Sequence, residues 1–150
     1  MHAGDLVQPV GAVTPETSLL DAATMFAGSG LPGIVVVDEQ RHPLAVLPGS
    51  ALVRLGVPQY VLDDPALAGV LDESSSELLR ARMARLTVAD ALADEDPDPH
   101  PQVAATSSLV EVASTMANER VGLVVVTDDR DHVLGVVTAA ALLAAVLPDA

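Results

Sequence analysis

Residues able to carry out covalent chemistry are scarce in this sequence. It contains no cysteine and no lysine, which excludes a thiolate nucleophile, a disulfide, a P-loop lysine and a Schiff base. The histidines are His2, His42, His100 and His132, all in expected loops or at the terminus, and no G-x-S-x-G motif occurs. We find no pairing of a nucleophile with a base, so the sequence does not predict an enzyme.

Two motifs have the spacing of a known site but the wrong context. The acidic run Asp94–Asp98 has the D-x-D-x-D spacing that opens an EF-hand, but Pro99 and Ala105 stand where that loop needs glycine and glutamate. The segment Gly28–Gly33 fits G-x-G-x-x-G, yet it follows an expected helix and leads into a strand, the reverse of a dinucleotide site. We interpret the first as a solvated acidic loop and the second as a helix-end turn, and we predict no metal site.

Two groups of titratable or basic residues allow alternatives. His42 and His132 occupy equivalent positions in a repeat, which suits a paired pH or metal sensor, or simply two exposed turns that lie far apart. Arg80, Arg82 and Arg85 form the one basic cluster, which suits a contact with an anion or acidic partner, or a solvated helix face.

Composition limits the classes of partner. The 150 residues carry a formal net charge of −14 at pH 7, which argues against binding to nucleic acid. Mean hydropathy is +0.42, but the longest uncharged stretch, Val133–Pro148, is shorter than the roughly 20 residues of a membrane-spanning helix. Asp5 and the absence of lysine and arginine from the N-terminal segment argue against a signal peptide. We therefore expect a cytoplasmic protein that is not embedded in a membrane.

An internal repeat organises the chain. Residues 18–53 and 108–143 are identical at 12 of 36 positions at a constant shift of 90, without a gap. Each copy predicts a short strand, a helix, two strands joined by a polar turn, and a second helix, giving β-α-β-β-α twice. The expected segments are strands near 10–14 and 103–105, helices from 18 and 108, strands 34–37, 44–47, 123–126 and 133–137, and helices near 50–55 and 139–147. Between the copies we expect helices at 64–71 and 74–85, and a short helix at 87–93 that opens the second copy.

The repeated segments carry a family resemblance. The runs GLPGIVVVDEQRHPLAVLPGSAL and VGLVVVTDDRDHVLGVVTAAAL resemble the hairpin and helix of CBS (cystathionine β-synthase) domains. Two such motifs in tandem resemble a Bateman module, and the whole is similar to small bacterial CBS-pair proteins. The resemblance implies an α+β fold with two β-α-β-β-α motifs around a pseudo-two-fold axis: motif 1 at 1–55, a helical connector at 56–86 and motif 2 at 87–150.

The resemblance also implies a regulatory site for an adenosine-containing ligand between the motifs. The family pattern places a phosphate-contacting hydroxyl at Thr138 and a ribose-binding aspartate at position 141, where this chain has Ala141; motif 1 has Pro48 and Ala51 instead. The ligand-binding residues it implies are Val13, Leu31, Pro32, Val103, Ala104, Arg120, Val121, Gly122, Leu123, Val137, Thr138 and Ala141. AMP, ATP or S-adenosylmethionine, with or without Mg²⁺, are the expected ligands, and no cofactor is required.

Two functions follow from this resemblance. In the first, the module senses an adenosyl ligand and modulates a separate effector protein such as a transporter or an enzyme. In the second, the lost aspartates mark a ligand-independent interaction subunit. Both expect a homodimer, because helices such as Ala139–Leu147 carry more apolar surface than one small module covers.

Overall fold

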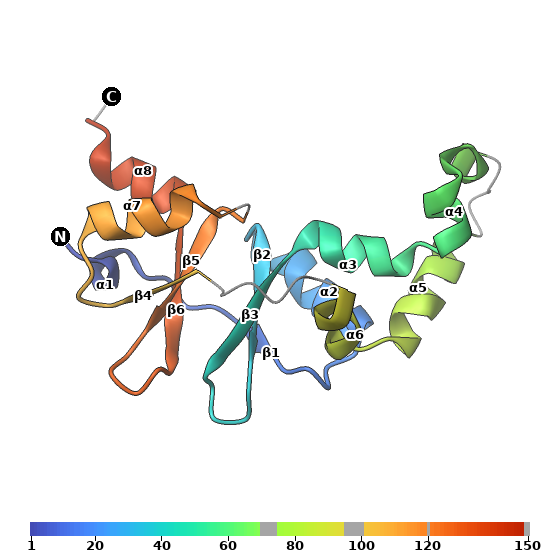
Figure 1. Cartoon of the computed structure of the whole chain (residues 1–150), viewed down its shortest axis with the longest axis horizontal. Helices are drawn as coiled ribbons and strands as arrows, with labels where there is room; N and C mark the ends of the chain where they lie inside the picture. The colour runs from blue at the N-terminus through green and yellow to red at the C-terminus, as the bar shows by residue number, and fades with distance from the viewer. Residues whose placement is uncertain (70–74, 95–100, 120, 149–150) are drawn as a thin grey trace.

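The computed structural model describes residues 1–69, 75–94, 101–119 and 121–148. Two three-stranded sheets lie side by side, each with helices on its outer face (Figure 1). In both sheets the first strand pairs parallel with the second, and the second pairs antiparallel with the third. The α+β fold with two repeated motifs is therefore confirmed.

The two motifs repeat the same elements. In motif 1 they are β1 (Ala12–Val13), α2 (Leu19–Ser29), β2 (Gly33–Val37), β3 (Pro43–Pro48) and α3 (Gly49–Gly56). In motif 2 they are β4 (Gln102–Ala104), α7 (Leu109–Ala117), β5 (Leu123–Thr127), β6 (Val133–Thr138) and α8 (Ala139–Val146). The capping serines start the first helices as the sequence predicts, since Ser18 Oγ accepts from Asp21 N–H at 3.0 Å and Ser108 Oγ accepts from Glu111 N–H at 3.2 Å.

The central strands β2 and β5 are buried on both faces, which explains their unbroken apolar sequences. One face of each strand packs under the helices of its own motif, through Ile34 and Val36 in motif 1 and through Val124 and Val126 in motif 2. The other faces meet each other in a shared inter-sheet core. Its buried members are Val35, Val37, Leu123, Val125, Val133 and Val136.

The motifs exchange their opening helices. A helix absent from the sequence prediction, α1 (Ala3–Leu6), packs on motif 2, where Ala3 N–H donates to Ser107 O at 2.9 Å. Its counterpart α6 (Val88–Asp94) packs on motif 1, where Val88 N–H donates to Thr17 O at 2.9 Å. The two helices therefore belong to the repeat, but at a shift of 85 residues rather than 90, so an ungapped comparison misses them.

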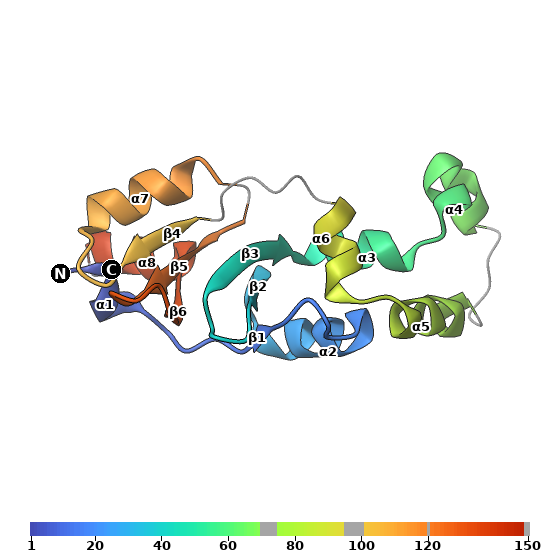
Figure 2. The same ribbon diagram turned by 60° about the horizontal axis from the view of Figure 1, so that its bottom comes forward.

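The connector extends away from the sheets (Figure 2). It contains α4 (Gln59–Asp63), the 3-10 helix η1 (Pro65–Gly69) and α5 (Ser75–Arg85). The helix expected over 64–71 is thus a 3-10 turn in its described part, and residues 70 and 71 lie outside the described residues, as do 95–100 of the acidic loop. Gly56 lets α5 approach α3, because a Cβ there would lie 2.8 Å from Met83 Cε.

In the described part of the chain, no helix has the length and apolarity needed to cross a bilayer.

Candidate functional site

The predicted site residues at the strand starts come together across the pseudo-two-fold axis. A Cβ placed on Gly122 would lie 4.0 Å from Pro32 Cγ, and a Cβ placed on Gly33 would lie 2.9 Å from Val121 Cγ1. Leu31 and Val121 both pack against the inter-sheet core. Segments from the two motifs thus form one continuous surface around these residues.

Thr138 lies beside this junction at the end of β6. It pairs with Leu123 in the β5–β6 register, and the next residue, Ala139, donates its N–H to Gly122 O at 2.9 Å. The Thr138 hydroxyl accepts from Ala141 N–H at 3.1 Å and so caps α8, while its own O–H can still donate. Ala141 is half-buried and supplies no acceptor for a ribose. In motif 1, Pro48 supplies no hydroxyl at the equivalent position.

The other predicted residues are distributed differently. Val13, Leu123 and Val137 are core residues, with 3%, 0% and 0% of their surface exposed, so only their backbones could meet a ligand. Val103 and Ala104 belong to β4, on the helix side of motif 2. Arg120 lies outside the described residues. The roles of all these residues in ligand binding stay predictions.

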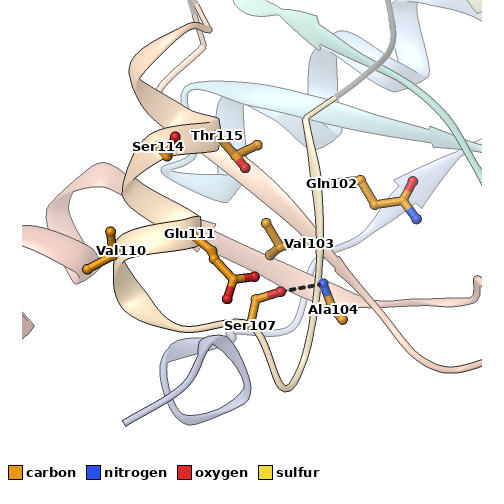
Figure 3. Close-up of a pocket in the computed structure, with 8 residues that line it drawn as sticks. All are labelled: Gln102, Val103, Ala104, Ser107, Val110, Glu111, Ser114 and Thr115. Carbon is orange, nitrogen blue, oxygen red and sulfur yellow. Dashed lines mark hydrogen bonds between the residues drawn. The ribbon is translucent and has the colours of Figure 1, made fainter.

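Val103 and Ala104 line a groove of about 530 Å³ between β4 and α7 (Figure 3). Sequence reasoning missed the other six lining residues, which come from the start of β4, from the turn after it and from α7. The full set is Gln102, Val103, Ala104, Ser107, Val110, Glu111, Ser114 and Thr115. The polar face of the helix beginning at Ser108 was the available signal, but only the fold shows that it borders a strand.

The two hairpin turns meet, so the expectation that His42 and His132 lie far apart is wrong. Their rings stack with centroids 5.1 Å apart and an interplanar angle of 12°. Val133 N–H also donates to Arg41 O at 3.0 Å, and Arg41 Nε donates to Val133 O at 3.1 Å. The turns are adjacent because the inter-sheet core brings β3 and β6 together.

Each stacked histidine pairs with the aspartate that begins its turn. His42 Nδ1 lies 2.9 Å from Asp38 Oδ2, and His132 Nδ1 lies 3.3 Å from Asp128 Oδ2. For Asp38, desolvation is the largest single effect and by itself would raise the pKa of the carboxyl. The hydrogen bonds that it accepts from the backbone and ring of His42, and the charge of that ring, outweigh desolvation, so the pKa is lowered. For Asp128, the His132 backbone N–H is the largest cause of a lowered pKa.

These lowered pKa values predict acid sensitivity. A carboxyl whose folded pKa is below its unfolded value, about 3.9, stabilises the fold above that pH and loses this contribution as pH falls through the folded pKa. Asp38 and Asp128 should therefore make the fold less stable as pH drops below about 4. As the pH is lowered from about 6 to about 3, the urea midpoint of unfolding should fall less in the Asp38→Asn/Asp128→Asn variant than in the parent. The exposed neighbour change Asp129→Asn is the matched control, and equal slopes in all three proteins would contradict the prediction.

Comparison with known proteins identifies the family. The CBS domain model matches residues 3–58 and 94–148. A CBS domain-containing protein of unknown function from Kribbella flavida is 36% identical, with a TM-score of 0.85 and 99% of each chain covered. The CBS domain of a membrane protein from Sphaerobacter thermophilus is 21% identical, with a TM-score of 0.73 and coverage of 99% of this chain and 90% of that one.

A third structure contains a nucleotide. CBSX2 from Arabidopsis thaliana in complex with AMP is 18% identical, with a TM-score of 0.67 and coverage of 96% of this chain and 94% of that one. At this identity the likeness shows the fold alone. No curated protein matches significantly. Because the family model covers both repeats, the resemblance is confirmed, and the chain belongs to the CBS domain family as a tandem pair.

Proposed function

We propose that the chain is a regulatory CBS-pair module that senses an adenosine-containing ligand between its motifs and modulates a separate protein partner. The observation that carries this proposal is the junction where Pro32 meets Gly122 next to Thr138. It joins equivalent segments of both motifs, so a ligand bound there would contact both and could change their relative position. The AMP complex of CBSX2, which has the same fold, supports an adenosyl ligand. CBS domains are generally non-catalytic, which agrees with a sensor rather than an enzyme.

The charge of the chain narrows the ligand. The net charge of −14 repels a bare polyphosphate. It therefore favours a neutral or cationic adenosyl compound, such as adenosine or S-adenosylmethionine, as the ligand. ATP would need Mg²⁺ to offset its charge. Because Ala141 supplies no carboxylate for the ribose, Thr138 is the side chain that we expect to contribute most to affinity. No cofactor is needed for this function.

Thr138→Ala should weaken binding of an adenosyl ligand that bears a phosphate or carboxylate, such as AMP or S-adenosylmethionine, about tenfold or more, because a hydrogen bond to that charged group is lost. A thermal-shift panel of adenosine, AMP, ADP, ATP and S-adenosylmethionine, with and without Mg²⁺, identifies the ligand, and calorimetry gives the affinity. The change also removes the cap of α8, at a cost of about 0.5–2 kcal/mol. Ser108→Ala removes the equivalent cap of α7 and is the matched control, expected to keep the parent's affinity. Equal affinities in both variants would place the ligand away from Thr138.

The second function is a ligand-independent interaction subunit of a transporter or an enzyme. The observation favouring it is the loss of the ribose acceptor in both motifs, at Ala51 and Ala141. Ala51 is 3% exposed, so no ligand could reach its side chain. The absence of a response to every compound in the panel would support this function and count against the sensor.

We also propose a homodimer formed through α8. This helix and the residue after it expose Leu143 by 53%, Val146 by 55% and Leu147 by 60%. Light scattering at micromolar concentration should give about twice the chain mass of 15.3 kDa for the parent. The variant Leu143→Glu/Val146→Glu should give a single chain, because charge would be buried at the interface. A parent mass of one chain would contradict the dimer.

A further inference from the structure

The segment of motif 1 equivalent to the groove between β4 and α7 carries a longer side chain. Gly11 precedes β1, and a Cβ placed on it would lie 3.1 Å from Met25 Sδ, so the Met25 side chain covers this edge of the motif 1 sheet. The repeat places Thr115 where motif 1 has Met25. The shorter threonine leaves the space that forms the groove in motif 2. Among the lining residues of α7, Thr115 shows the largest loss of side-chain length relative to its motif 1 counterpart.

The lining of the groove is rich in hydrogen-bond acceptors. Glu111 extends toward Ser107 between the helix and the strand, and Ser114 and Thr115 add hydroxyls from α7 (Figure 3). Ser108 Oγ donates to Glu111 Oε1 at 3.3 Å, and among the described residues the other carboxylate oxygen of Glu111 has no partner. Ser107 Oγ accepts from Ala104 N–H at 3.1 Å and retains a second lone pair.

Among the described residues that line the groove, no side chain is basic. The groove is lined by one carboxylate, three hydroxyls and one amide, with the apolar surfaces of Val103 and Val110 beside them. The chain as a whole has a net charge of −14, which repels an anion approaching from solvent. A primary ammonium group offers three donors and a positive charge, matching a carboxylate flanked by hydroxyls. An aliphatic chain attached to it would lie on the two valines.

We infer that the groove between β4 and α7 is a second ligand site, separate from the inter-motif junction, that binds an aliphatic ammonium compound of the polyamine class. Glu111 accepts the ammonium hydrogen bonds together with Ser107 and Ser114, and Thr115 provides the room. In motif 1 the longer Met25 stands in place of Thr115 and lies over Gly11. This inference is independent of the adenosyl site, since it uses neither Thr138 nor the residues at the junction.

Spermidine is the probe, and the amide signals of the ¹⁵N-labelled protein are followed in about 0.15 M salt to screen diffuse attraction. We expect saturable shifts confined to residues 102–104 and 107–115. Thr115→Met, which copies the motif 1 residue, should abolish them without changing the melting temperature. Glu111→Gln should weaken binding about tenfold or more, because the charged acceptor is lost.

The reciprocal change provides the matched control. Met25→Thr should open the motif 1 edge and produce a second set of shifts near Thr14–Met25, where Asp21 is the repeat equivalent of Glu111. Shifts that spread over the acidic surface without saturating would overturn the inference. So would undiminished binding in both Thr115→Met and Glu111→Gln, each tested separately.

Discussion

Replacing Leu123 with alanine should lower the free energy of unfolding by about 2–5 kcal/mol. Leu123 is 0% exposed and belongs to the inter-sheet core, where it packs with valines from both motifs. The lost methyl groups leave a cavity between two sheets that cannot both move inward to fill it, because each is held by its own helices. Urea denaturation followed by circular dichroism measures the change.

Leu134→Ala is the matched control for this prediction. Leu134 lies on β6 but is 46% exposed, so its truncation should cost well under about 1 kcal/mol. Because the inter-sheet core belongs to both motifs, Leu123→Ala should also retain one cooperative transition, shifted to lower urea. Equal midpoints for the two variants, or a transition split in two, would show that the sheets do not share a core.

Gly135→Ala should destabilise the fold by about 3 kcal/mol through the N-terminal segment. A Cβ at this position would clash with the backbone oxygen of Gln8 and would lie 2.8 Å from Val7 Cγ2. The N-terminal segment would have to leave the edge of β6. Two backbone hydrogen bonds would then be lost: Gln8 N–H to Val136 O at 2.9 Å and Val136 N–H to Gln8 O at 3.0 Å.

Hydrogen exchange is the informative readout for this variant. Amides of Ala3 and Gly4, which donate to motif 2, should lose protection along with Gln8, while β2 keeps its own. Gly28→Ala is the matched control, because nothing lies within 4 Å of a Cβ there and helix α2 should gain up to about 1 kcal/mol. Unchanged protection of α1 in Gly135→Ala would contradict the proposed clash.

Most of the fold could be predicted because its signals are local. Ser18 and Ser108 cap helices, and the valine runs of β2 and β5 form strands, whatever lies elsewhere in the chain. Of the two exchanged helices, α6 was predicted over 87–93 but α1 was not, because the 85-residue spacing between His2 and Thr87 differs from the 90 residues of the rest of the repeat. Their shared signal is an aspartate three residues later, whose carboxylate accepts from the first N–H at 2.8 Å in both.

The candidate sites depended on contacts that no local pattern encodes. The stacking of His42 on His132 follows from how two sheets pack face to face, and each turn alone looks like an exposed loop. The groove beside Glu111 lies between α7 and β4, and only the fold shows that this helix and this strand border each other. Conversely, Thr138 lies next to Gly122 as the resemblance implies, because the β5–β6 register brings their strand ends together.

The exchange of opening helices also fixes an order of events during synthesis. Helix α1 leaves the ribosome before the rest of this fold, yet the residues that it contacts, Ala105 and Ser107, are made after the whole connector. Motif 1 likewise waits for α6 before its core is complete. Neither motif can complete its core alone, so the nascent chain must keep apolar segments exposed until β6 emerges. Contacts between segments so far apart in the sequence slow folding, and the exposed apolar segments favour aggregation. A peptide tag fused ahead of Ala3 would therefore lie against the last part of the fold to form.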